Sequence, residues 1–240
     1  MHYMKYHIGC SGFSYKEWKG EFYPEKLAQK KWFEFYTSQF RSLELNVTFY
    51  RFPQPAVLQG WYERSPADFL FSVKAPRLIT HYKKFNDTGI QLQDFYESIA
   101  NGLKSKLGPV LFQLPKELVY TEELLEKLIQ SLDKNFINAI EFRDASWWIP
   151  SVQEELIKNK IIFCGISHPT LPNAFIPGPD VYYRYHGVPR LYYSEYDQSV
   201  LKDMADKLRS PTVKQAFIYF NNTAHGAAIH NARQLQHLLS

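Results

Sequence analysis

The sequence predicts an α/β protein of the TIM-like (β/α)8 barrel class, and three observations support this prediction. Short runs rich in β-branched and aromatic residues alternate with amphipathic stretches, a pattern typical of a parallel sheet with crossover helices. Eight such units in 240 residues match the size of a TIM barrel. No linker, repeat or low-complexity run interrupts the chain, so residues 1–240 are expected to form a single domain.

The expected strands and helices follow one another in a regular order. Strands are expected near residues 6–9, 43–47, 69–73, 110–113, 138–142, 161–164, 181–185 and 216–220. Helical periodicity is clearest at residues 27–40, 88–107, 121–132, 197–210 and 227–239. After the sixth strand, "SHPTLPNAFIPGPD" contains four prolines, which exclude a regular helix through most of the segment. An irregular loop is therefore expected there.

Composition narrows the class of partner and the compartment. The net charge is +4 and the pI is about 8.8, but no basic block occurs, so anionic partners are only weakly favoured. Cys10 and Cys164 lie far apart without a CxxC motif, which indicates neither a disulfide framework nor a zinc knuckle. The segment "MHYMKYHIGC" lacks the apolar run of a signal peptide, and no run of eighteen apolar residues follows. We therefore expect a cytoplasmic protein with no membrane partner.

Polar residues recur on one side of the expected strands. In "SLELNVTFYRFP", residues 42–53, a carboxylate and an amide alternate with apolar residues. Alternate strand residues of a closed barrel face its lumen, while the other set packs against the helices. Sorting the strands in this way gives a polar inward set: Glu44, Asn46, Ser72, Lys74, Gln113, Glu141, Arg143, Arg184, His186, Tyr219 and Asn221.

The outermost members of this set fall where strands end, which is the face that carries TIM-barrel active sites. Lys74, Arg143 and Arg184 outnumber Glu44 and Glu141, so this face is expected to suit a carboxylate or a phosphate. The loops after the strands add polar and aromatic groups typical of a small-ligand pocket. They bring Gly9, Ser11, Gly12, Arg77, His81, Asp144, Trp147, Gly187, Tyr192 and Tyr193.

Several long segments together resemble the YecE-like family, domain of unknown function 72. They are "GCSGFSYKEWKGEFYP", "ELNVTFYRFP", "FLFSVKAPRLITH", "GPVLFQLP", "EFRDASW", "YYRYHG" and "IYFNNTAHGAAIHNA". The resemblance implies a TIM-like barrel and no established reaction. By position, it implies these characteristic polar residues: Glu44, Asn46, Lys74, Arg77, His81, Gln113, Glu141, Arg143, Arg184, His186 and Asn221.

The first functional hypothesis is an enzyme that acts on a small anionic or sugar-like substrate without a metal or another cofactor. The candidate catalytic residues are Glu44, Glu141, Lys74 and His186, with a glutamate as general acid or base and the lysine as an anion holder or Schiff-base former. Glu141 and Arg143 could instead neutralise one another. The candidate substrate-binding residues are Asn46, Arg77, His81, Gln113, Arg143, Trp147, Arg184, Tyr193 and Asn221.

Two other hypotheses stay open. A metal-dependent hydrolase, similar to the barrel endonucleases that act on nucleic acid, would use His81, His186, Glu44 and Glu141, although the sequence has no HxH or HExxH motif. A binding module without turnover would explain the aromatic and cationic residues equally well. Nucleic acid could be its partner, because "YRYHGVPRLYY" interleaves basic and aromatic residues. We favour packing as the role of Tyr183 and Tyr185, which share a core-facing side.

Overall fold

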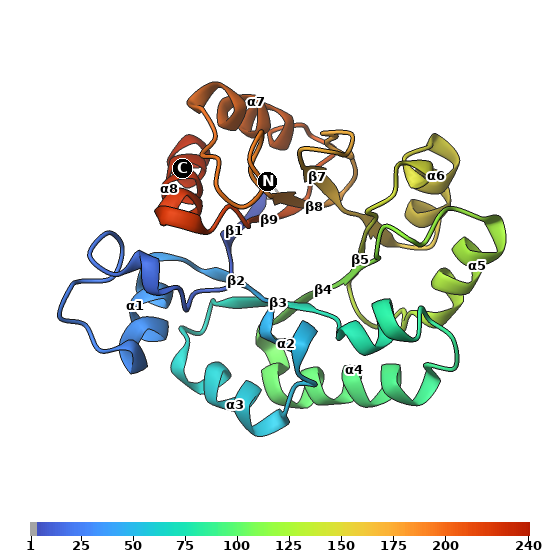
Figure 1. Cartoon of the computed structure of the whole chain (residues 1–240), viewed down its shortest axis with the longest axis horizontal. Coiled ribbons are helices and arrows are strands. Elements are labelled where there is room, and N and C mark those ends of the chain that lie inside the picture. The colour runs from blue at the N-terminus through green and yellow to red at the C-terminus, as the bar shows by residue number, and fades with distance from the viewer. Residues whose placement is uncertain (1–3) are drawn as a thin grey trace. The chain divides into compact units, whose positions relative to one another are not determined.

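The computed structural model describes residues 4–240, which divide into two compact units (Figure 1). The first unit contains the chain up to Glu44 together with Gly165–Ser240, and the second contains Leu45–Cys164. Each unit contains part of the parallel sheet and its own helices, so we describe each by itself.

The first unit has a parallel sheet in the order β2-β1-β9-β8-β7. Its strands are β1 (Lys5–Ser11), β2 (Ser42–Leu45, which ends on the first residue of the second unit), β7 (Gly165–Ser167), β8 (Asp180–Tyr185) and β9 (Gln215–Phe220). Its helices are α1 (Trp32–Gln39), α7 (Gln198–Leu208) and α8 (Ala227–Leu239), with the short helical turns η1 (Lys16–Trp18), η2 (Gln29–Lys31) and η6 (Ala224–Gly226). Helices α7 and α8 lie side by side (Figure 1).

The second unit has a parallel sheet in the order β6-β5-β4-β3. Its strands are β3 (Leu70–Lys74), β4 (Leu107–Gln113), β5 (Asn138–Glu141) and β6 (Ile161–Phe163). Its helices are α2 (Val47–Tyr50), α3 (Pro55–Arg64), α4 (Gly89–Leu103), α5 (Glu122–Ser131) and α6 (Pro150–Lys158). Three short turns complete it: η3 (Leu78–Tyr82), η4 (Lys104–Lys106) and η5 (Ala145–Trp147). Helices α3 and α4 lie side by side (Figure 1).

Local sequence explains why these segments adopt these structures. Strand β4 is a nearly continuous buried apolar run, as expected for a parallel strand that is covered on both faces. Helix α5 begins where Thr121 Oγ1 accepts a hydrogen bond from the backbone N–H of Leu124 at 3.1 Å. Its buried residues Leu125, Leu128 and Ile129 recur at helical spacing and form one apolar face. Patterns of this kind position the strand ends that carry the polar residues.

The architecture confirms the predicted α/β TIM-like barrel class. All eight expected strands are present, the sixth as β6, and a short strand that was not expected, β7, follows at Gly165–Ser167. Residues 168–179, all within the described part of the chain, contain no helix, as their prolines predicted. Tyr183 and Tyr185 were predicted to be packing residues, and both are buried.

The second expected strand ends earlier than predicted. Residues 43–47 were expected to be extended, but β2 ends at Leu45 and Asn46 has helical backbone angles as it leads into α2. The hydroxyl of Thr48 accounts for this change, because its single O–H lies between two acceptors, Leu45 O at 2.9 Å and Lys74 O at 2.6 Å. Asn46 therefore does not belong to the alternating strand pattern.

Candidate functional site

In the first unit, the polar strand residues form a buried network around Glu44. Its carboxylate accepts hydrogen bonds from Ser11 Oγ at 2.5 Å, Tyr182 OH at 2.5 Å and Arg184 Nη2 at 2.7 Å. Glu44 and Arg184 are 0% and 1% exposed. Burial, followed by the negative charge of Glu44, raises the pKa of Tyr182 well above its usual value, so this hydroxyl keeps its proton. The contacts give Glu44 the geometry of a counter-ion for Arg184.

His186 extends this network at the end of β8. One ring nitrogen, Nε2, lies 3.4 Å from Arg184 Nη1, and the other, Nδ1, lies 2.9 Å from the side-chain amide of Asn221. The ring of His168 makes an edge contact with it, with 5.6 Å between the ring centroids. The structure thus brings four predicted site residues together in this unit, namely Glu44, Arg184, His186 and Asn221.

In the second unit, a cationic and aromatic group of side chains lies at the ends of β3 and β4. We call Phe49, Lys74, Arg77, His81 and Gln113 the Lys74 cluster. Lys74 Nζ donates to Gln113 Oε1 at 2.8 Å and lies 4.1 Å from the centroid of the Phe49 ring. His81 makes an edge contact with the same ring at 4.9 Å between centroids. Phe49 therefore packs against both basic side chains.

The strand that carries Lys74 has a shift in its pairing register just before this residue. The β3–β4 register shifts between Phe71 and Val73, two residues before the β3 strand ends. Pro109 explains the shift, because it has no N–H to donate to the ladder, and Ser72 Oγ donates to its carbonyl at 2.9 Å. Such bulges redirect side chains next to functional sites.

His81 is half-buried and electrically neutral at physiological pH. Burial first, then the positive charges of Lys74, Arg143 and Arg77, lower its pKa from 6.5 to about 4, while Glu117 opposes them. Its Nδ1 lies 2.8 Å from Thr80 Oγ1, and its Nε2 lies 3.5 Å from Gln113 Nε2. Positive charge therefore accumulates around a neutral imidazole.

Unusual backbone surrounds the Lys74 cluster. His81 belongs to η3, a π-helical turn in which the N–H of Lys83 donates to Leu78 O at 2.9 Å. Lys84, Phe85 and Asp87 follow with φ of 49°, 61° and 48°. Non-glycine residues rarely adopt this left-handed region, and strained positions of this kind concentrate at functional sites.

Other predicted residues lie at strand ends but have different neighbours. Arg143 Nε lies 2.5 Å from Glu141 Oε1, which places the two charges in direct contact. Trp147 is fully buried, with its ring stacked on Phe142 at 4.4 Å and its indole N–H donating to Leu118 O at 2.6 Å. These contacts give Trp147 a packing role.

Asn46 and Tyr193 occupy more open positions. Asn46 is partly exposed, and its buried Oδ1 has no hydrogen-bond partner in the described part of the chain. Tyr193 is exposed, and it lies 3.9 Å from the guanidinium of Arg190 and 5.9 Å from the ring of His225. Their roles in substrate binding stay predictions.

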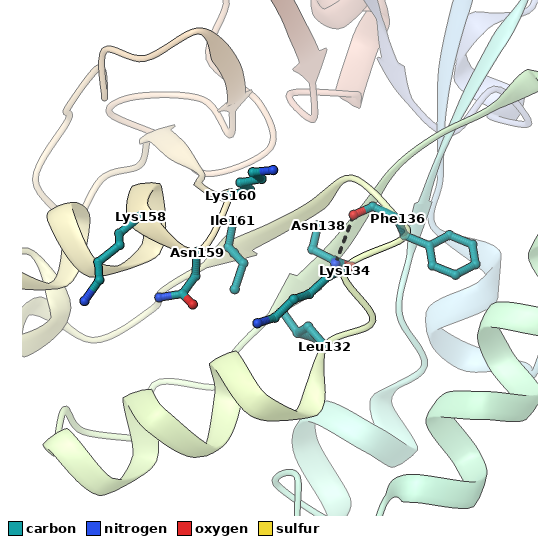
Figure 2. A pocket seen from close by; sticks show the side chains of 8 residues that line it. All are labelled: Leu132, Lys134, Phe136, Asn138, Lys158, Asn159, Lys160 and Ile161. Atoms are coloured by element: carbon teal, nitrogen blue, oxygen red, sulfur yellow. Dashed lines mark hydrogen bonds between the residues drawn. The ribbon is translucent and has the colours of Figure 1, made fainter.

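A pocket elsewhere in the second unit does not form a convergent site. It has a volume of about 210 Å³ and opens where β5 and β6 begin, away from the strand ends. Three lysines line it, but Figure 2 shows the amino groups of Lys134, Lys158 and Lys160 pointing in different directions. Lys158 also lies 3.3 Å from Glu155. Lys158 and Lys160 lie at and just after the end of α6, where lysines favour the helix C-terminus and do not need a ligand.

Residues 4–240 contain neither a metal-binding cluster of the usual ligands nor a helix suited to cross a membrane. No group of three or more histidine, cysteine, aspartate or glutamate side chains is placed where it could hold a metal ion. Among the helices of the same residues, none is both long and apolar enough to cross a membrane.

The sequence did not indicate all of the residues in these two networks. Tyr182 shares the side of β8 that carries Arg184, so the alternation that selected the arginine could have selected the tyrosine. Phe49 of the Lys74 cluster was not selected, because an aromatic residue just after a strand is most often a packing residue and no local pattern showed its contact with Lys74.

The parallel strands, the helices that follow them and the polar residues at the strand ends define a protein of the TIM-like barrel class. The family described as "Protein of unknown function DUF72" matches residues 7–240. The chain therefore belongs to the DUF72 family, which confirms the resemblance seen in the sequence.

Individual relatives agree with this assignment. UPF0759 protein YunF of Bacillus subtilis is 25% identical over 268 residues, covering 97% of this chain and 94% of that protein. UPF0759 protein YecE of Escherichia coli is 25% identical over 135 residues, covering 56% of this chain and 49% of that protein. The crystal structure of a DUF72 family protein from Thermotoga maritima has a TM-score of 0.86 and 29% identity, covering 98% of this chain and 99% of that one.

Proposed function

We propose that this protein binds a small anionic ligand, carrying a phosphate or a carboxylate, at the Lys74 cluster of the second unit. The observation that carries the proposal is the placement of Lys74 and His81 against one ring, that of Phe49. Burial first, and then the positive charges of Lys74, Arg143 and Arg77, lower the pKa of His81 to about 4. Groups that disfavour a proton on a histidine favour a negative charge at the same place. An anion is therefore the natural ligand of this cluster.

The protonation state of His81 determines what this residue can contribute to ligand binding. Because its pKa is about 4, the ring is uncharged near neutral pH and has a nitrogen that can accept a proton. Lys74, held by Gln113 and Phe49, supplies a fixed positive charge beside it. The pair can thus hold an anion, with the lysine supplying the charge and the uncharged imidazole supplying a hydrogen-bonding group.

The energetic contribution of Lys74 can be bounded. A hydrogen bond to a charged group stabilises a complex by roughly 1.5–3 kcal/mol, which corresponds to about ten- to a hundredfold in affinity. Lys74 is nearly buried, so its charge is screened less than that of a surface lysine. We expect its removal to have a larger effect than removal of any exposed lysine.

Calorimetric titration with sulfate tests the proposal. Sulfate keeps its charge at working pH, and calorimetry separates saturable binding from the general stabilisation that sulfate gives to proteins. Lys74→Met should weaken sulfate binding about tenfold or more, and Arg77→Gln should weaken it a few-fold. Lys134→Met is the matched control, because it removes an exposed lysine of the same unit that lines the pocket in Figure 2.

Circular dichroism and melting curves establish whether each variant is folded. Arg77 is partly exposed, so its variant remains informative if Lys74→Met fails to fold. The proposal is wrong if sulfate shows no saturable binding to the parent protein. It is also wrong if both site variants bind sulfate as well as Lys134→Met does.

A further inference from the structure

Two tyrosines next to the Lys74 cluster present their rings to solvent. Tyr50 is 64% exposed and Tyr82 is 65% exposed, and among the aromatic side chains of this unit only Phe52, at 36%, is also classed as exposed. The guanidinium of Arg77 lies near both rings, 5.5 Å from the centroid of Tyr50 and 5.3 Å from that of Tyr82. A grouped exposed aromatic surface of this kind is characteristic of a binding site rather than of scattered surface residues.

Phe49 joins these tyrosines to the cationic groups. Its ring makes an edge contact with Tyr50, with 5.0 Å between centroids and an angle of 90° between the planes. The same ring contacts Lys74 and His81. One continuous aromatic surface therefore carries Lys74 at its Phe49 end and Arg77 beside the two exposed tyrosines at its other end.

The arrangement also prepares Arg77 for hydrogen bonding. A guanidinium beside aromatic faces is held by cation–π attraction, worth about 0.5–1 kcal/mol at exposed sites. Its planar N–H groups remain directed along its edges, where they can donate to hydroxyl or carboxylate oxygens. The tyrosines thus orient a donor as well as offer stacking surfaces.

Resting on the anion binding proposed above, we infer that the ligand is a ring-bearing anion, whose phosphate or carboxylate meets Lys74 and whose ring stacks on Tyr50 and Tyr82. A sugar ring and an aromatic ring both have the apolar face that such stacking needs. The shared chemistry is a flat or chair-shaped ring attached to an anion. The tyrosines distinguish this ligand from a small anion without a ring.

Calorimetry with three probes tests the inference on the full-length protein. Glucose phosphate carries a sugar ring, phenyl phosphate carries an aromatic ring, and glycerol phosphate carries none. We expect at least one ring-bearing probe to bind the parent about tenfold more tightly than glycerol phosphate. The ring-bearing probe that gains affinity identifies the kind of ring.

Variants separate the ring effect from the anion effect. Tyr50→Ala and Tyr82→Ala should remove the advantage of the ring and leave the affinity for glycerol phosphate unchanged. Tyr50→Phe and Tyr82→Phe should keep the advantage, since the ring remains, and Ile90→Ala is a control for loss of an exposed apolar side chain. Lys74→Met should weaken all three probes.

The outcomes distinguish the two proposals. Equal affinity of the parent for ring-bearing and ringless probes, or a ring advantage that survives both alanine variants, overturns the inference while anion binding stands. Failure of Lys74→Met to weaken any probe overturns anion binding at this cluster. Absence of binding by all three probes at millimolar concentrations overturns both.

Discussion

Arg184 and Glu44 form a buried ion pair between β8 and β2, with Arg184 Nη2 lying 2.7 Å from Glu44 Oε1. Both side chains are excluded from water, so each charge depends on the other for its stabilisation. The hydroxyls of Ser11 and Tyr182 occupy further acceptor positions of the carboxylate. This arrangement predicts that Glu44 acts through Arg184, by holding it in place.

Arg184→Met should therefore destabilise the protein by roughly 3–5 kcal/mol, because it leaves a buried carboxylate without its cation. Urea unfolding measures the change. Lys207→Met is the matched control, since Lys207 and Asp203 form an exposed pair at 2.6 Å whose loss should cost at most about 1 kcal/mol. Equal effects of the two variants would contradict the buried pair. Glu44→Gln with unchanged stability and lost turnover would instead support a catalytic glutamate.

The pKa of His81 predicts a pH dependence of stability. The pKa of His81 is about 4 in the folded protein, whereas the ordinary value for a histidine is 6.5. Between these values the unfolded chain binds more protons than the folded chain, so the contribution of His81 is fully present above pH 6.5 and is lost as the pH falls toward 4.

His81→Gln should therefore make stability less sensitive to pH over this interval. Urea unfolding of parent and variant at the two ends of the interval gives the comparison, and the difference between them isolates His81 from the carboxylates that titrate nearby. A parent and a variant with the same slope would show that His81 titrates normally.

Glu141 predicts opposite effects on stability and on anion binding. Its buried carboxylate lies against Arg143, one of the charges that act on His81. Glu141→Gln removes this negative charge, so sulfate affinity should rise about threefold while the protein loses roughly 1–3 kcal/mol of stability. Calorimetry and urea unfolding measure the two quantities.

Opposite signs matter because general loosening of the structure would lower both quantities together. The exposed Glu126→Gln on α5 is the control, and it should change neither one appreciably. A fall in sulfate affinity for Glu141→Gln would indicate that the pair positions the cluster instead of opposing its charge.

The sequence identified polar residues near most strand ends, but it did not identify the contacts between them. Alternation along β2 and β8 selected Glu44 and Arg184, because a buried parallel strand imposes a period of two on its side chains. Their partnership spans 140 positions of the chain, and no local pattern records it. Pairing of distant strands had to be seen in the structure.

Aromatic residues show the same limit more strongly. Trp147 and Tyr50 both follow a strand closely, yet the first is fully buried and the second is mostly exposed. The difference depends on tertiary neighbours, because Trp147 packs against Phe142 and Tyr120, whereas in the described part of the chain the only aromatic and cation–π contacts of Tyr50 are those with Phe49 and Arg77. For this reason the exposed tyrosines beside Arg77 were found only in the folded chain.

Gly9 sets the distance between β1 and β2, on which the Glu44 network depends. Gly9 pairs with Ser42, and two positions further along the same ladder Ser11 pairs with Glu44. A Cβ at Gly9 would lie 2.1 Å from Ser42 O, a backbone atom that can move only if the strand moves. Gly9→Ala should therefore separate the strands and cost more than about 4 kcal/mol, which is exceptional for one methyl group.

Gly60→Ala provides the contrasting substitution. Gly60 lies within α3, and a Cβ there would meet no atom within 4 Å. Alanine is the better helix former, so this variant should gain roughly 0.5–1 kcal/mol. Urea unfolding of both variants tests the argument, and a Gly9→Ala protein as stable as the parent would mean that β1 and β2 do not approach this closely. Ser11, two residues after Gly9, donates to Glu44, which in turn holds Arg184. Gly9→Ala should therefore also weaken any function that depends on Arg184.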